Sequence, residues 1–525
     1  MNHFIAGIIK IIVLEASVAL LLIDRLVEGK WEKHRIWAAR ILAGVMVLAW
    51  CNFGGLRGNG GMIHEWEQFH FYLGAKYQSE VGWFDLYKAA ILADRESTHI
   101  LDGMKETRDI ATFEVVSIEQ AMADGPRVRG KFTDARWAEF KSDWTQMVAT
   151  PIGWHRVLLD HGNSNSPAWA LIAHPIAELM PLSKTTQTLI GLIDMVLMAI
   201  MWFFIFRTFG ERPALVALFI WAALPIVFDY LAGSFLRWDW IFCLGMAICF
   251  MKKEKWATAG AFFGFAVATK LFPLYFGVCL GIRALFIINR EKRIPARYKR
   301  FAVGTVATGL AAVVLSAAMF GGFWAWKEYK QRIDVARDEK FYSIQYSLQT
   351  VYLQFSNSSL EEVAKGGLLF PGEIKQERRD VDVNNQAAGF FVIKLLFTAL
   401  VVLLILRADD IQAFTLGPLL VFIWLIVNMY YWNMLGFLAM GLYLRKERPP
   451  LGALLGLHAI LMFYYLYQHL NRGFSEGYAV AVCLCAWIAT FAFFEWRQIR
   501  GHVAELMGLG PAPVVEAQKP ARAKS

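Results

Sequence analysis

Two glutamates, Glu65 and Glu67, open the longest polar segment of the chain, shortly beyond the end of an apolar run. A carboxylate where membrane meets water can take the proton of a hydroxyl that attacks a lipid-linked substrate. Residues two positions apart point to different faces of a helix, so we do not expect both carboxylates to serve one site. The alternative for each is a solvated loop side chain.

Two cationic positions could hold an anion. Arg237 and Asp239 lie in a very short turn between apolar runs, where the planar guanidinium could bind a phosphate or could only pair with Asp239 to seal the turn. Lys270 interrupts a continuous apolar stretch, and Pro273 removes a helical hydrogen bond just after it. This pattern predicts a broken helix with a cation beside the break, or a lysine that snorkels to the interface.

Histidines and tyrosines near these positions are candidate lining residues. His64 and His70 flank the acidic pair and could orient it, although interfacial packing is the simpler interpretation. Tyr430 and Tyr431 open a short apolar run, where their rings could flank a sugar or a lipid chain, or could belong to an aromatic belt.

No familiar motif predicts a metal or a nucleotide. His155, His161 and His174 are not at metal-ligand spacing, and no HExxH or DxD-type acidic motif accompanies them, so we predict no metal ligands. A requirement for a divalent cation stays open. P-loop and GxGxxG motifs are absent from the sequence.

The composition points to a membrane protein. Of the 525 residues, 57% are hydrophobic and only 18% are charged, and the chain has 20 Trp and 40 Phe. The net charge of +9 does not indicate nucleic acid, because Lys and Arg cluster in short loops between apolar runs. The six cysteines lie in or beside apolar runs, which argues against a disulfide framework or a zinc site.

The apolar runs predict an all-α polytopic membrane protein with about thirteen transmembrane or re-entrant helices. With thirteen spans, every basic loop falls on one side, which we assign as cytoplasmic. Helices near Pro273 and Tyr430 are expected to be broken or re-entrant. The first run is a retained helix or, alternatively, a signal peptide; it lacks a basic n-region, which favours the helix. The predicted spans are 4–24, 37–55, 185–206, 213–232, 236–251, 256–270, 272–288, 301–321, 387–406, 411–428, 430–444, 451–470 and 476–495.

Two long polar segments, 56–184 and 322–386, then lie on the non-cytoplasmic side, and their many apolar residues predict that they fold. Residues 66–87 have apolar positions at helical spacing and predict a helix along the membrane surface. Residues 105–148 predict another helical stretch. The tail from about 501 is expected to be disordered.

Four stretches, taken in order, resemble a known family. They are Glu67 to Ala75, Asn165 to Pro175 with Pro181, Ala259 to Pro273, and Tyr346-Ser347-Leu348. The first stretch is similar to an acidic residue before a Tyr-Tyr-x-Ala-Ala-like helix, and the second to a Pro-rich re-entry into the membrane. The third is similar to a small-residue helix ending in Lys-x-x-Pro, and the fourth to a polar-Ser-Leu segment. This order resembles the polyprenyl-phosphate-sugar-dependent glycosyltransferases of the GT-C class, most nearly glycosyltransferase family 87, over roughly 37–350 with a weaker echo to 445.

The sequence also departs from the family. Glu67 stands where Asp is usual, and the run from Gly233 to Asp239 replaces a Gly-Gln-x-Asn-like turn. A long insert separates Tyr77 from Pro167, and an extra helix precedes the module. The resemblance divides the chain into an extra helix with a basic loop (1–36), a catalytic module (37–350), a membrane bundle (351–500) and a cytoplasmic tail (501–525).

The resemblance implies an inverting transfer of a hexose or pentose, such as mannose, from a polyprenyl phosphate to a lipid or glycan hydroxyl at the outer face of the cell (plasma or inner) membrane. Glu67, with Glu65 as second choice, would be the base, and Lys270 and Arg237 would hold the donor phosphate. No nucleotide is needed. A transporter or lipid flippase is the alternative, and a non-catalytic scaffold is a third interpretation. Possible substrate-lining residues are His64, His70, Asp239, Tyr346, Tyr430 and Tyr431.

Overall fold

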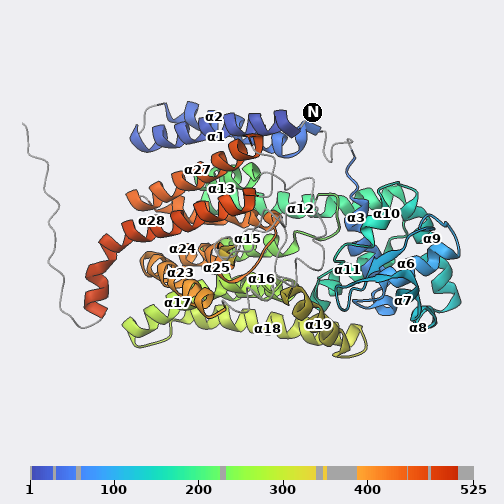
Figure 1. Ribbon diagram of the computed structural model, residues 1–525. Helices are drawn as coiled ribbons and strands as arrows, with labels where there is room; N and C mark the ends of the chain where they lie inside the picture. Colours follow the sequence, from blue (N-terminus) through green and yellow to red (C-terminus); the bar gives the residue numbers. More distant parts are fainter. Residues whose placement is uncertain are drawn as a thin grey trace, which may run out of the picture.

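The structure, a computed structural model (Figure 1), describes residues 3–27, 31–54, 61–224, 232–338, 347–349, 351, 387–445, 447–470 and 475–506. These residues are almost entirely helical. The exception is one antiparallel hairpin in which β1 (Glu106–Arg108) pairs with β2 (Val115–Ser117). The predicted all-α class is therefore confirmed for the described part of the chain, apart from this hairpin.

A bundle of long apolar helices forms one part of the molecule, on the left of Figure 1. Its first members are α1 (His3–Leu26), α2 (Glu32–Trp50), α12 (Lys184–Phe209), α13 (Glu211–Ala223), α15 (Asp239–Lys252), α16 (Trp256–Thr269), α17 (Leu274–Glu291) and α18 (Ala296–Met319). The later members are α23 (Ala387–Arg407), α24 (Asp410–Thr415), α25 (Gly417–Trp424), α26 (Leu435–Leu444), α27 (Arg448–Leu470) and α28 (Ser475–Leu506).

Four of the described helices are long and apolar enough to cross a membrane: α12, α18, α23 and the Arg448–Leu466 part of α27. Along α18 the side chains of Val306, Leu310 and Val314 are exposed, as lipid-facing positions would be. The chain is thus a membrane protein by the length and composition of these helices. Helices also occupy the other predicted spans, but several are short, so the count of thirteen stays a prediction.

Small residues bring α16 and α18 into close contact. A Cβ atom on Gly260 would lie 2.0 Å from the Phe301 carbonyl oxygen, and one on Gly304 would lie 2.0 Å from the Ala257 carbonyl oxygen. Backbones that approach this closely pack well without large side chains between them. The contact with α18 fixes the orientation of α16 and therefore the position of its C-terminal end, which Lys270 follows.

Both predicted breaks are present. Helix α16 ends at Thr269, Lys270 has an extended backbone, and α17 begins only after Pro273. Helix α25 ends at Trp424, and a 3₁₀ turn, η3 (Met429–Met434), precedes α26. Residues at such breaks carry backbone groups that are not used within a helix.

Residues 61–183 form a second folded part, which we call the α3–α11 domain (right of Figure 1). It has its own hydrophobic core, as expected for a folded loop. Another helix, α19 (Trp324–Asp338), comes from the second long polar segment. The elements of the domain are α3 (Glu65–Gln68), π-helical η2 (Phe69–Leu73), α4 (Gly74–Lys76), α5 (Gln78–Val81), α6 (Leu86–Arg95), the hairpin, α7 (Ile118–Met122), α8 (Gly125–Gly130), α9 (Asp134–Val148), α10 (Trp154–Val157) and α11 (Pro167–Leu179).

Two local predictions for this domain were wrong in part. Residues 66–87 are helical, but in several short pieces, and Phe69, Leu73 and Tyr77 are fully buried in the domain core rather than laid on a membrane surface. Helix α9 covers them, for example through the Tyr77–Phe140 ring contact. Within 105–148 the hairpin replaces the start of the predicted helix, because residues 106–108 pair with 115–117.

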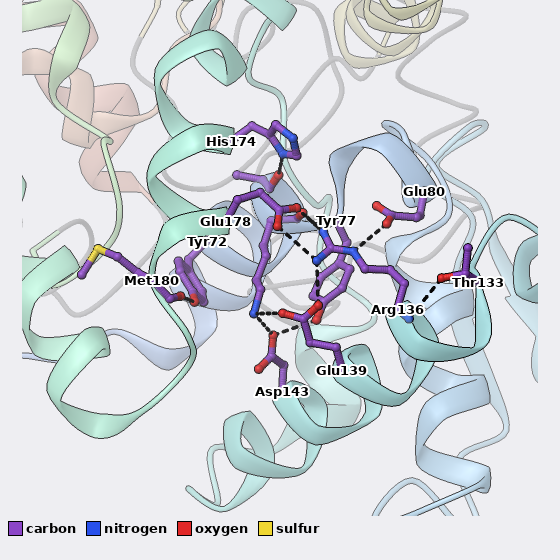
Figure 2. A network of polar contacts seen from close by, with 12 residues as sticks. Tyr72, Tyr77, Glu80, Thr133, Arg136, Glu139, Asp143, His174, Glu178 and Met180 are labelled. Atoms are coloured by element: carbon purple, nitrogen blue, oxygen red, sulfur yellow. Dashed lines mark hydrogen bonds and ion pairs between the residues drawn. The ribbon is translucent and has the colours of Figure 1, made fainter. Parts of the chain in front are cut away.

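An ion-pair network ties α4 and α5 to α9 and α11, and Figure 2 shows it from close by. The buried Lys76 ammonium lies 2.7 Å from carboxylate oxygens of both Glu139 and Asp143. Arg136 pairs with Glu80 at 2.7 Å and with Glu178. Because each buried charge has partners, the network holds in place the chain that follows Glu67.

Helix α28 runs to Leu506, so the disordered tail predicted from 501 is wrong for residues 501–506. Residues 507–525 and the predicted candidate Tyr346 lie outside the described residues.

Candidate functional site

Charged side chains from three distant parts of the sequence meet where the α3–α11 domain joins the bundle. We call Glu67, Arg237, Asp239 and Lys270 the charged cluster. Glu67 Oε2 lies 2.8 Å from Arg237 Nε, and both side chains are largely buried. The Ser234 hydroxyl donates to the same carboxylate oxygen at 3.5 Å. The sequence predicted all four residues, but not that Glu67 and Arg237 form an ion pair.

A carboxylate in α12 positions Arg237. The backbone N–H groups of Arg237 and Trp238 donate to Asp194 at 2.9 and 3.1 Å. The guanidinium lies over the Phe71 ring, 4.3 Å from its centre. Asp194 is buried within a helix that is long and apolar enough to span a membrane, and the sequence analysis missed it. A lone carboxylate in an apolar run was the signal that could have found it.

Lys270 is the least satisfied member of the charged cluster. Its side chain is only 6% exposed, and among the described residues its ammonium has no hydrogen-bond partner. The negative charges of Asp239 and Glu67 attract the ammonium, and the positive charge of Arg237 repels it. Asp239, at the start of α15, likewise has one buried oxygen without a hydrogen bond in the described part of the chain. A buried ammonium without a hydrogen bond is costly, which makes the position receptive to an anion.

Glu65 has a different partner. Its carboxylate lies 3.8 Å from the ammonium of Lys184, at the start of α12, whereas Glu67 pairs with Arg237. The two glutamates therefore separate in the way that helical geometry predicts.

The two flanking histidines also separate. His64 caps α3, and its Nδ1 accepts the Glu67 backbone N–H at 3.4 Å. His70 points into the α3–α11 domain and shares a 2.7 Å hydrogen bond with the Tyr87 hydroxyl. Burial lowers the pKa of His70 from 6.5 to about 4, so its ring is neutral near pH 7. His64 thus supports the backbone at Glu67, whereas His70 belongs to the domain interior.

Aromatic rings surround the cluster on the bundle side. Tyr430 lies 5.5 Å from the Arg237 guanidinium, and its hydroxyl accepts from the Asn428 amide at 2.7 Å. Tyr431 packs against Trp240 and Phe272, the latter between Lys270 and Pro273. These rings border the charged cluster with flat apolar surface.

Helix α19 adds residues that the sequence analysis missed. The Arg332 guanidinium is buried over Phe113, 3.9 Å from the ring centre, and its Nε donates to the Asn163 carbonyl at 3.3 Å. Glu328 accepts the Trp83 backbone N–H at 3.2 Å. The positive charge of Arg332 is close enough to Lys270 to repel its ammonium. The second polar segment thereby contributes to the same junction.

Within the described residues, no group of three His, Cys, Asp or Glu side chains is placed to hold a metal ion. Searches of protein-family models, of curated proteins and of solved structures find no match to this chain.

Proposed function

We propose that this chain is a membrane glycosyltransferase of the GT-C kind, which moves a sugar from a polyprenyl phosphate to an acceptor hydroxyl. The observation that carries the proposal is Lys270, a buried ammonium without a hydrogen bond among the described residues, beside the Glu67–Arg237 ion pair. Transfer from a lipid phosphate requires a cation that binds the phosphate and a nearby carboxylate that accepts the proton of the acceptor.

The donor phosphate would lie against Lys270. The break between α16 and α17 places the ammonium between apolar helices, so a hydrocarbon chain could lie in or beside the bundle while its phosphate reaches the cation. Binding would supply the missing hydrogen-bond partner. The rings of Tyr430 and Tyr431 would border the sugar or the first part of the lipid.

Glu67 would accept the proton of the acceptor hydroxyl. As the acceptor oxygen bonds to the anomeric carbon, the bond from that carbon to the phosphate oxygen breaks and its electron pair stays on the phosphate. Protonation of Glu67 removes the charge that pairs with Arg237. The guanidinium is then released to stabilise the phosphate at the moment when its charge grows.

The side of the membrane follows from charge. With the predicted spans, basic residues cluster in the loops on the opposite side from the α3–α11 domain, which supports a site on the non-cytoplasmic face of the cell membrane. A lipid-linked donor suits that face. The competing transporter function calls for internal repeats, and the sequence contains no convincing one.

The test uses the purified chain in proteoliposomes with polyprenyl phosphates that carry labelled mannose, glucose, galactose or arabinose, and with a membrane extract as acceptor. We expect transfer by the wild type from one of these donors. Lys270→Met should lower kcat/KM for that donor about 100-fold or more, because the phosphate loses a buried cation.

The same variant separates function from folding. Lys270→Met replaces an ammonium that has no hydrogen bond in the described residues with an apolar chain of similar length, so its Tm should equal or exceed that of the wild type. No transfer from any of the donors, or full activity of Lys270→Met, would contradict the proposal.

A further inference from the structure

The loop between α10 and α11, residues 158–166, has no regular secondary structure, yet side chains hold its backbone carbonyls almost one after another. These side chains come from the hairpin, from α6, from the turn before α6 and from α19. The contacts are Leu158 O with Thr107 (2.9 Å), Leu159 O with Arg108 (2.8 Å), Asp160 O with Tyr87 (3.1 Å), Asn163 O with Arg332 (3.3 Å), Asn165 O with Trp83 (2.7 Å), and His161 O with Arg332. A loop fixed in this way is preorganised.

Asn165 is the unexplained residue of this loop. Its side chain is 1% exposed, and neither its Oδ1 nor its Nδ2 has a hydrogen-bond partner in the described residues. Buried amides are nearly always hydrogen-bonded, because an unpaired one costs free energy. An amide that is held in place but unsatisfied at both ends indicates a missing polar ligand.

Asp160 offers a second polar group. The indole N–H of Trp66 donates to its Oδ2 at 2.7 Å. Desolvation alone would raise the pKa of Asp160, but the neighbouring His161 ring, with Nδ1 3.6 Å from Asp160 Oδ1, and the hydrogen bond from Trp66 hold it well below its usual range. The carboxylate is therefore an ionised acceptor in a fixed orientation.

The loop is tied to both halves of the charged cluster. The Ser166 hydroxyl, next to Asn165, donates at 2.5 Å to the carbonyl of Ala268, two residues before Lys270. On the other side, Trp66, which holds Asp160, is the neighbour of Glu67. The loop thus lies beside the position proposed for the reacting sugar.

We propose that loop 158–166 is a subsite for sugar hydroxyls, with Asn165 as its specificity-determining residue and Asp160 as a second acceptor. The inference rests on the proposed function and adds the part of the substrate that the loop contacts. An amide both donates and accepts, as a hydroxyl does, and a carboxylate accepts from a hydroxyl. The same carboxylate would repel a phosphate, so the loop suits the neutral hydroxyls rather than the anionic group.

The experiment compares Asn165→Leu with the wild type, using Asp102→Asn, an exposed position of the same domain, as the control. We expect Asn165→Leu to raise KM about 10-fold or more, since hydrogen bonds to the sugar are lost, with a much smaller change in kcat. Its Tm should equal or exceed that of the wild type, because the substitution removes an unsatisfied buried amide. A raised donor KM places the donor sugar in the loop, and a raised acceptor KM places the acceptor there.

A binding measurement makes the result independent of transfer. Saturation-transfer NMR with methyl α-mannoside and methyl β-glucoside should show contact with the wild type and Asp102→Asn, and loss of contact with Asn165→Leu and Asp160→Asn. If the wild type binds these sugars but transfers none, the proposed function fails while the subsite stands. Unchanged KM and unchanged NMR contact in Asn165→Leu, with a lower Tm, would overturn the subsite and show that the amide is structural.

Discussion

At the scale of single residues, the charged cluster combines satisfied and unsatisfied groups. Glu67 and Arg237 form an ion pair, with 2.8 Å between Oε2 and Nε. The ammonium of Lys270 has no hydrogen bond among the described residues. A cluster that served only stability would pair every buried charge, as the Lys76 network does. The contrast between two buried lysines in one chain is the residue-level argument for a ligand at Lys270.

The sequence could predict these residues but not their pairing. Glu67, Arg237 and Lys270 stood out because charge is costly near apolar runs. The ion pair joins positions 170 apart. Asn165 only opened a stretch that resembles the family, and Arg332 carries no sequence signal, since an amide or a guanidinium in a polar loop is ordinary. Only packing shows that the Asn165 amide is buried and unpaired among the described residues.

At the scale of elements, η2 and α6 belong to the domain that supports Glu67, and His70 of η2 contacts Tyr87 of α6. The hydrogen bond from His70 to Tyr87 joins these elements, and Tyr87 continues to the carbonyl of Asp160. The sequence predicted helix here from apolar spacing. It could not predict that the helix is broken and buried, because the residues that cover it, in α9, lie within the long insert.

This interior histidine gives a pH dependence. The folded-state pKa of His70 is about 4, below the 6.5 of the unfolded chain, so below pH 6.5 the unfolded state binds a proton that the folded state does not. The contribution of His70 should therefore destabilise the domain as the pH falls from 6.5 to 4, by up to about 3 kcal/mol, and this contribution should stay constant above pH 6.5.

The check is thermal unfolding followed by tryptophan emission between pH 7.5 and 4.5. His70→Gln does not titrate and should show a shallower fall than the wild type. His99→Gln, at an exposed position, serves as the control. Identical pH profiles for His70→Gln and the wild type would show that another group is responsible.

At the scale of the whole molecule, a domain with its own core is fixed to a helical bundle (Figure 1), and the Glu67–Arg237 pair puts the candidate site at their junction. Composition predicted the membrane class, and the many apolar residues of segment 56–184 predicted that it folds. The number of spans could not be settled in this way, because helices such as α15 and α16 have only 14 residues each, short of the ~20 that a perpendicular crossing needs.

The orientation of the molecule can be measured with introduced cysteines. In a background without Cys51, Cys483 and Cys485, Asp102→Cys in the α3–α11 domain should react with a membrane-impermeant maleimide in intact cells. Lys255→Cys, in the basic loop between α15 and α16, should react only after permeabilisation, as the positive-inside rule predicts. The reverse labelling pattern would move the site to the cytoplasmic face and remove the argument for a lipid-linked donor.

The central claim is that Glu67 takes the proton of the acceptor during transfer from a polyprenyl-phosphate sugar. Its most direct test is the rate of transfer by Glu67→Gln and Glu65→Gln in proteoliposomes. We predict that Glu67→Gln lowers kcat about 100-fold or more while Glu65→Gln stays near the wild-type rate, because general-base catalysis contributes on that scale and Glu65 pairs elsewhere. A wild-type rate for Glu67→Gln would contradict the account.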